Sequence, residues 1–241
     1  MQPLVSIITP ARMCGPFLEH MIQSIRAQTY ANWELLISAA GSADPTYTEA
    51  TRIAHGDERI YVRRETAPGF AVNWNAAYNM SMGDVVARQE ADDWSDPRRL
   101  ELGVAALVAG ADVVSCGMVR IMADGVMQAM PGTGAMRAAA WAVPGGPPGP
   151  GSDGIMAWRR VYSQVGLYDP VYDASADTDW TFRALVVEPV LRWFHIDHPL
   201  YFYRDHPEQM TKRIGREGVA VHLERQAHYA PRIRALYGGT P

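Results

Sequence analysis

Apolar runs alternate with amphipathic stretches through the first hundred residues, which predicts strands alternating with helices. Residues 4–9 and 33–38 are nearly continuous apolar runs, typical of buried strands, and we expect Pro10 to end the first of them. Between these runs the apolar positions recur at helical spacing, namely Phe17, Leu18, Met21, Ile22 and Ile25. The same reasoning predicts helices over 46–55 and 71–82, and strands over 60–63 and 85–87. Such a series predicts a Rossmann-like, nucleotide-binding half-sheet whose ligand lies beyond the carboxyl ends of its strands.

The second half of the chain has a less regular pattern. It predicts helices over 96–109, 159–165 and 215–237 with another after Asp179, and strands over 112–116, 119–122, 126–128, 154–158, 190–196 and 200–203. Ala123-Asp124-Gly125 predicts a hairpin turn. The Pro/Gly run at 143–151 can hold neither helix nor strand, and a surface loop near the site is favoured over a domain linker. We expect one α/β domain with a mixed central sheet flanked by helices.

Composition narrows the class of protein. A chain of 241 residues with 48% hydrophobic residues can form one substantial core. The net charge of −4 and the pI near 6.0 give no reason to expect nucleic acid as a partner. Two distant cysteines, Cys14 and Cys116, predict neither a disulfide nor a zinc site and fit a reducing cytoplasm.

No signal peptide and no apolar run of spanning length is visible, so we expect a soluble, cytoplasmic protein. Residues 211–241 hold six Lys or Arg against two Glu. This basic C-terminal helix is best interpreted as having a solvated face, and peripheral contact with an anionic membrane stays open.

Three acids, Glu90, Asp92 and Asp93, directly follow the predicted strand at 85–87. Like charges this close disfavour joint ionisation, so a divalent cation is one explanation for the cluster. Alternation would place Glu90 and Asp92 on one side and turn Asp93 away. The alternative is that the acids merely cap the next helix, with Ser95 as N-cap and Pro97 in its first turn.

Several motifs, in order, resemble family 2 glycosyltransferases with the GT-A fold, and the match covers roughly residues 3–211. They are residues 5–10, residues 28–35, Gly41-Ser42-Ala43-Asp44, Asn75 with Gly83-Asp84, Glu90-Ala91-Asp92-Asp93 with Pro97, residues 165–169, Asp177-Thr178-Asp179-Trp180 through Arg183, and Tyr203-Arg204-Asp205-His206-Pro207. The resemblance implies a nucleotide-sugar-binding half at 1–98, an acceptor-binding half at 99–211 and a C-terminal basic helix at 212–241.

The resemblance also implies roles for individual residues. Glu90-Ala91-Asp92 occupies the Asp-x-Asp position, where Asp92 would bind Mg²⁺ or Mn²⁺ and Glu90 would reach the ribose or the metal. His206 would lie near the diphosphate or metal, and Asp177 would be the catalytic base of an inverting displacement. Further donor-binding positions are Thr9, Pro10, Ala40, Asn75, Ala91 and Arg204, the last of which could offset phosphate charge. The alternatives are a structural role for His206 before Pro207 and an N-cap role for Asp177.

The chain departs from the family pattern at four positions. Ala39-Ala40 stands where two aspartates are usual, which removes the carboxylate that hydrogen-bonds uracil, and Ala11, Trp74 and Ala176 each replace a polar residue. Either the donor carries another base, such as guanine or thymine, read by backbone groups and by stacking on Trp74 or a nearby aromatic, or nucleotide binding has decayed. The first explanation is favoured, because Asp92, Asp177 and His206 all remain.

The sequence thus predicts an inverting, metal-dependent glycosyltransferase. Its partners would be a nucleoside diphosphate sugar and a hydroxyl-bearing acceptor, whether saccharide, lipid-linked or small molecule, and the loop at 143–151 would cover the acceptor side. A non-catalytic sugar-nucleotide or partner-binding module on the same fold is the alternative. A nucleotidyltransferase ranks lower, because residues 9–15 offer only Arg12 and one glycine as a phosphate loop.

Overall fold

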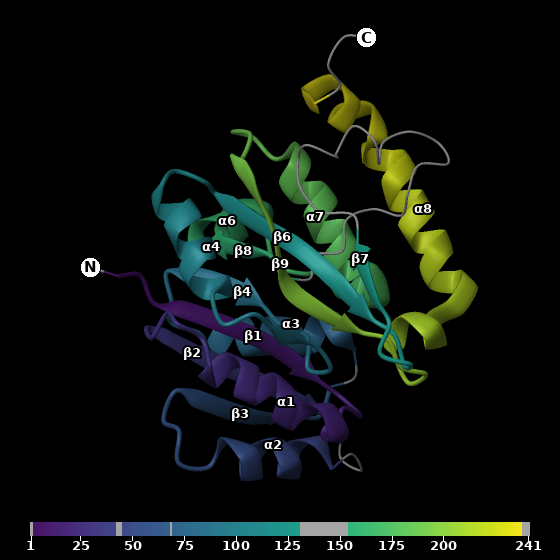
Figure 1. Ribbon diagram of the computed structural model, residues 1–241. Helices are drawn as coiled ribbons and strands as arrows, with labels where there is room; N and C mark the ends of the chain where they lie inside the picture. The colour runs from purple at the N-terminus through teal and green to yellow at the C-terminus, as the bar shows by residue number, and fades with distance from the viewer. Residues whose placement is uncertain (1, 42–44, 68, 131–153, 238–241) are drawn as a thin grey trace.

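The computed structural model describes residues 2–41, 45–67, 69–130 and 154–237, which form a nine-stranded mixed sheet with helices on both faces (Figure 1). The first half-sheet is parallel. In it, β1 (Val5–Ala11) lies between β2 (Trp33–Ala40) and β4 (Val85–Arg88), and β3 (Ile60–Glu65) pairs with β2. The carboxyl ends of these strands therefore meet at one edge, as the alternating pattern predicts.

The second half extends the same sheet with mixed pairing. β8 (Met156–Trp158) runs antiparallel to β4 and to β6 (Val113–Ile121), and β6 is parallel to β9 (Trp193–Arg204). β7 (Met127–Met130) forms the expected hairpin with β6, and β5 (Trp94–Ser95) pairs antiparallel with β9. Because β9 returns beside β5, the chain that follows β9 arrives next to the acidic cluster.

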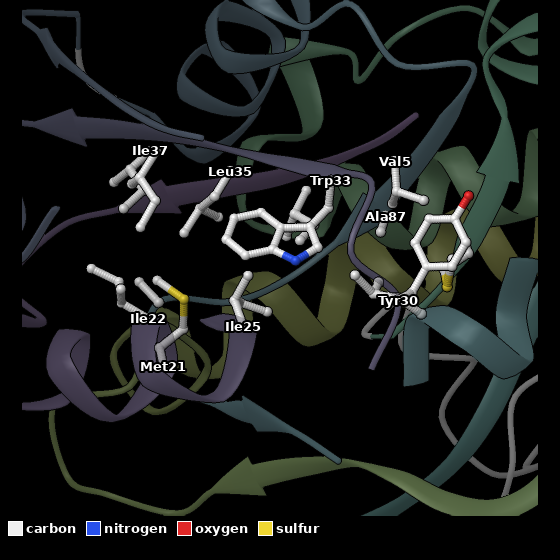
Figure 2. Packing of buried hydrophobic residues seen from close by; sticks show 14 of the residues in the cluster. Val5, Met21, Ile22, Ile25, Tyr30, Trp33, Leu35, Ile37 and Ala87 are labelled. Atoms are coloured by element: carbon white, nitrogen blue, oxygen red, sulfur yellow. The ribbon is translucent and has the colours of Figure 1, made fainter. Parts of the chain in front are cut away.

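Successive side chains along each strand point to opposite faces of the sheet, and each face has its own hydrophobic core. Ile7, Leu35 and Ile37 face α1 (Gly15–Arg26), in a cluster that includes residues of α2 (Thr46–Ala54) and α4 (Arg99–Val108). Figure 2 shows Leu35, Trp33 and Ile37 opposite Met21, Ile22 and Ile25 of α1. Ile8 and Leu36 point the other way, toward α3 (Phe70–Met80), α6 (Arg159–Val165) and α7 (Ala176–Val186).

The last helix, α8 (Met210–Tyr237), stands beside α7 (Figure 1), where Ala230 and Ile233 pack against Phe182 and Leu185. A short 3-10 segment, η2 (Pro170–Ser175), precedes α7 and contacts α8. None of the described helices is long and apolar enough to cross a bilayer. Cys14 and Cys116 are buried and free, which confirms that they form no disulfide.

The expectation that Pro10 ends the first strand was wrong, because β1 continues to Ala11. The Ile8 carbonyl accepts the Gln89 N–H on the β4 side, so Pro10, two residues on, also faces that side. The register of β4 ends at Arg88, opposite Ile8. No residue of β4 lies opposite Pro10, so its missing N–H costs the sheet no hydrogen bond.

Other element boundaries differ as well. The predicted strands at 190–196 and 200–203 are one strand, β9, whose register jumps from Ile196 to Pro199, and those at 112–116 and 119–122 are one strand, β6. A bulge, rather than a strand end, absorbs the two extra residues. Helix α4 begins at Arg99 and Ser95 lies in β5, so Ser95 is not an N-cap and the acidic cluster does not cap this helix. The loop at 143–151 lies outside the described residues.

Candidate functional site

A pocket of about 380 Å³ lies where the carboxyl ends of β1, β2 and β4 meet. This is the edge where open α/β sheets bind ligands. Its walls come from the ends of three strands, the start of α3, η2 and the segment after β9. The lining residues are Pro10, Ala11, Arg12, Met13, Cys14, Ala40, Gly69, Phe70, Asn73, Glu90, Ala91, Asp92, Asp173, His206, Glu208 and Met210.

Asp92 and His206 are in direct contact, although 114 positions separate them in the chain. His206 Nε2 lies 2.9 Å from Asp92 Oδ2, and Glu208 Oε2 lies 3.3 Å from the other ring nitrogen, Nδ1. The hydrogen bond from His206 holds the pKa of Glu208 below its usual value. Phe17 packs against the imidazole at 4.5 Å between ring centroids, so the ring of His206 is held on several sides.

The donor atoms of Asp92 and His206 fit a divalent cation. One carboxylate oxygen and one imidazole nitrogen meet on the pocket wall, and Glu208 orients the imidazole as outer partners of metal-bound histidines do. Within the described residues, no group of three or more His, Cys, Asp or Glu side chains is arranged to hold a metal. Mg²⁺ and Mn²⁺ suit such a sparse set, because substrate phosphates and water can complete the coordination.

Asp93 and Arg204 lie behind the pocket wall rather than on it. The Arg204 backbone N–H donates to Asp93 Oδ1 at 2.8 Å, and its Nε donates to the Asp92 carbonyl at 2.9 Å. Its guanidinium lies over Trp94 and Phe17, and beside His20, whose pKa is lowered by burial and by the charge of Arg204. Arg204 thus fixes the backbone of the cluster, and Glu90 and Asp92 face the pocket while Asp93 is buried.

Glu90 and Asp177 are joined by a residue that the sequence analysis missed. Arg88, only 4% exposed, donates from Nε to Glu90 Oε1 at 2.7 Å and from Nη1 to Asp177 Oδ2 at 3.0 Å. Asp177 lies in the first turn of α7, and the Ser175 side chain before it makes no capping hydrogen bond. The available signal was a charged residue at the end of the otherwise apolar β4, two positions before Glu90.

At the β2 end of the pocket the strand ends at Ala40, whose small side chain lines the pocket. Ser38, on the same side of the strand, hydrogen-bonds Asn73 Oδ1 at 3.3 Å, and the Asn73 amide donates to the Gly69 carbonyl. These contacts place the start of α3 against the end of β2. Sequence reasoning did not single out Asn73 as a site residue.

Asp173 brings a carboxylate to this end from η2. Its Oδ1 accepts the Ala71 N–H at 3.2 Å, in the first turn of α3, and its backbone adopts φ 20° and ψ −85°. Gly69 has φ 112°, and a Cβ there would lie 3.0 Å from Asp173 Oδ1. Both the positive φ and this close contact favour glycine at position 69. Asp173 was visible in the sequence only as one member of an acidic group.

The pocket lining excludes three of the predicted donor-binding residues, namely Thr9, Asn75 and Arg204. Thr9 is fully buried, and its hydroxyl has no hydrogen-bond partner in the described part of the chain. The Asn75 amide binds the backbone N–H and carbonyl of Tyr168. Pro10, Ala40 and Ala91 do line it.

The expectation that Trp74 stacks on a base was wrong, because Trp74 is fully buried. Its ring stacks with those of Tyr78, Tyr162 and Tyr168 in the core beneath α3. Apolar packing between α3 and α6 explains why a tryptophan occupies this position. Phe70, the first residue of α3, does line the pocket.

Comparisons with known proteins agree with this geometry. A family model described as Glycosyl transferase family 2 matches residues 6–134. "Putative glycosyltransferase EpsE" of Bacillus subtilis is 39% identical over 107 residues, which are 44% of this chain and 38% of that protein. "Uncharacterized glycosyltransferase EpsJ" of the same organism is 24% identical over 94% of this chain and 68% of its own length. The chain thus spans well under half the length of EpsE.

Solved structures share the fold. TarS of S. aureus, in complex with UDP-GlcNAc, superposes with a TM-score of 0.74 over 97% of this chain and 71% of that chain, at 14% identity. The mannosyltransferase PcManGT of Pyrobaculum calidifontis, in complex with GDP-Man and Mn²⁺, gives a TM-score of 0.69 over 96% of this chain and 65% of that chain, at 20% identity. Likeness at this identity establishes the GT-A fold.

Proposed function

Because this chain belongs to glycosyl transferase family 2, we propose that it transfers a sugar from a nucleoside diphosphate donor to a hydroxyl group of an acceptor. The observation that carries the proposal is the pairing of Asp92 with His206 at 2.9 Å, on the wall of a pocket at the carboxyl ends of β1, β2 and β4. A carboxylate and an imidazole that meet in this way suit a cation, and the pocket lies where nucleotides bind to such sheets.

The donor would lie along the strand ends. The diphosphate would occupy the β4 end, near Asp92 and His206, and the nucleoside would extend toward Ala40 and Asn73 at the β2 end. A Mg²⁺ or Mn²⁺ ion held by Asp92 and His206 would supply positive charge to the departing diphosphate. The UDP-GlcNAc and GDP-Man complexes of two proteins with this fold support a sugar-nucleotide donor, and the Mn²⁺ in one of them supports a metal.

Asp177 is the proposed base. It comes from the half of the chain at 99–211, to which we assign the acceptor, and reaches the donor side through Arg88 and Glu90. The acceptor oxygen would attack carbon 1 of the sugar while the bond from carbon 1 to the diphosphate oxygen breaks and its electron pair leaves with the diphosphate. The hydroxyl proton would pass to Asp177, and a single displacement would invert the anomeric carbon.

The first test measures binding. The melting temperature of the chain is recorded with UDP, GDP, dTDP, CDP and ADP, each with and without Mn²⁺. A ligand that binds only the folded state raises the melting temperature, because it stabilises that state by about 2.7 kcal/mol at a ligand concentration of a hundred times Kd. We expect at least one nucleoside diphosphate to act with Mn²⁺ and to act less without it.

The second test measures turnover. Release of nucleoside diphosphate from the matching sugar donors is followed with water or a sugar acceptor, for wild type and for Asp177→Asn. General bases typically contribute about 10²- to 10⁴-fold, so turnover should fall by that range while donor binding stays within a few-fold. Asp179→Asn on the same helix is not a suitable control, because Asp179 is fully buried and pairs with Arg183. Asp169→Asn is preferable, because Asp169 is partly exposed and does not line the pocket.

Binding without turnover in the wild-type chain would instead favour a sugar-nucleotide-binding module on the same fold. No thermal shift with any nucleotide under any metal condition would refute both functions.

A further inference from the structure

We propose that Arg88 is a positioning residue that places the base Asp177 against the donor through Glu90. This inference rests on the proposed transferase function and adds a residue to it. It is carried by one buried guanidinium that touches two carboxylates from different halves of the chain, at 2.7 Å and 3.0 Å. Glu90 follows β4 on the donor side, and Asp177 lies in the first turn of α7 on the acceptor side.

The Arg88 side chain is held in one place. Its backbone N–H donates to the Ile155 carbonyl at 2.9 Å, and its own carbonyl accepts a hydrogen bond from the buried Arg99. Its guanidinium lies 5.2 Å from the centre of the Phe70 ring, on the first residue of α3. The side chain is 5% exposed, so water contributes little to its solvation. A guanidinium has a planar set of donors, and its two contacts therefore fix two carboxylates relative to each other.

Asp177 needs such a partner. It lies in the first turn of a helix, where the backbone favours a carboxylate but leaves its rotamer open. The other charged residues of α7 and α8 nearby point to each other, since the fully buried Asp179 pairs with both Arg183 and Arg225. Asp173 on η2 binds the Ala71 N–H. Arg88 joins Asp177 to the donor-binding half.

This arrangement links the two substrates. A donor that engages Glu90 acts on the guanidinium that also binds Asp177, so donor position and base position are set together. Small errors of position are costly, because reaction requires the attacking oxygen, carbon 1 and the base to be aligned. Loss of Arg88 should therefore lower kcat more than it raises the KM for the donor.

The experiment compares Arg88→Met and Arg88→Lys with wild type, using steady-state release of nucleoside diphosphate from the donor that the wild-type chain turns over best. We expect Arg88→Met to lower kcat by about 10- to 100-fold with the donor KM within about 3-fold. Arg88→Lys should recover part of this loss, because it keeps the charge but cannot hold both carboxylates in a fork. The matched control is Arg159→Met, which removes a hydrogen-bonded arginine at the opposite end of β4.

A double-mutant cycle gives the sharper test. If Arg88 transmits the effect of Glu90 to the base, Glu90→Gln lowers kcat in wild type but adds little in the Arg88→Met chain. Thermal melting of every variant separates loss of fold from loss of rate, and Arg88→Lys carries the test if Arg88→Met does not fold.

An unchanged kcat in both Arg88 variants, or full additivity with Glu90→Gln, would overturn the inference while the transferase function stands. A wild-type chain that turns over no donor would overturn both.

Discussion

Charges are paired at the β4 end of the pocket, whereas the described residues at the β2 end are neutral side chains and one carboxylate that comes from η2. At the β4 end, Glu90 contacts Arg88, and Asp92 and Glu208 both contact His206. At the β2 end stand Ala40 and Asn73, with Asp173 reaching in from η2. The first end offers the charged side chains that the proposed metal and diphosphate would need, and the second leaves room for differences in the group bound there.

The two ends of the pocket are also held in place by different parts of the fold. Contacts between the segments that follow β4 and β9 position Asp92 and His206, because both segments lie beside β5. Asp173 depends on η2, where the ring of the preceding residue, Tyr172, lies 4.2 Å from the guanidinium of Arg225 on α8. Arg225 in turn pairs with the buried Asp179 of α7. The β2 end therefore relies on packing between η2, α7 and α8, whereas the β4 end relies on the segments that follow two strands.

The largest effect is expected from Asp92→Asn, which removes a charge that the β4 end is built around. Loss of an outer-shell partner typically weakens metal binding by about 10- to 100-fold, and loss of a ligand should cost at least the upper value. Isothermal titration with Mn²⁺ in the presence of the preferred nucleoside diphosphate measures it. Asp96→Asn, an acid outside the pocket that pairs with Arg98, is the control. Equal Mn²⁺ affinity in Asp92→Asn and wild type would contradict the assignment of this end.

A smaller effect is expected from Asp173→Ala at the β2 end. We expect Asp173 to accept a hydrogen bond from the nucleoside, and a hydrogen bond to a charged group contributes roughly 1.5 kcal/mol, so affinity should fall by about 10-fold. Competition binding with the preferred nucleoside diphosphate and with inorganic pyrophosphate separates the two ends. Only the nucleotide should lose affinity.

Asp169→Asn changes an acid on the same segment that does not line the pocket. If it weakens nucleotide binding as much as Asp173→Ala does, the effect comes from the shape of η2, and the carboxylate of Asp173 does not contact the nucleoside.

The fold was predictable wherever periodicity and local chemistry agree. The strands at 33–40 and 60–65 and the helices at 15–26 and 46–54 follow from apolar spacing, and the hairpin follows from Ala123-Asp124-Gly125. The expectation that Pro10 ends a strand was wrong because a proline loses a sheet hydrogen bond only where a neighbouring strand continues on its N–H side. That depends on the sheet and not on the sequence near Pro10. The predicted break between the strands at 190–196 and 200–203 was wrong for a similar reason, since a bulge in β9 accommodates Asp197 and His198.

The motif residues of the candidate site were predictable from the sequence, but the residues that contact them were not. Asp92, His206 and Asp177 follow from the family resemblance, and the first two meet in one pocket. Arg88 was hidden because a charge inside a strand is interpretable only once its partners are known. Trp74 was one of the aromatic residues considered for stacking on the nucleotide base, because it stands in place of a polar residue, yet helix packing buries it.

The smallest effect is expected from Glu208→Gln, which tests how far the charge pairing at the β4 end extends. Glu208 contacts His206 Nδ1 at 3.3 Å, but its side chain is 59% exposed, so water replaces much of what the contact contributes. We expect Mn²⁺ affinity in the presence of nucleotide to fall by about 3-fold, below the range of about 10- to 100-fold typical of buried outer partners. The same titration as for Asp92→Asn measures it, with Glu101→Gln on α4 as an exposed control. A loss as large as that of Asp92→Asn would mean that Glu208 itself binds the metal, and the charged end of the pocket would then reach past His206 toward α8.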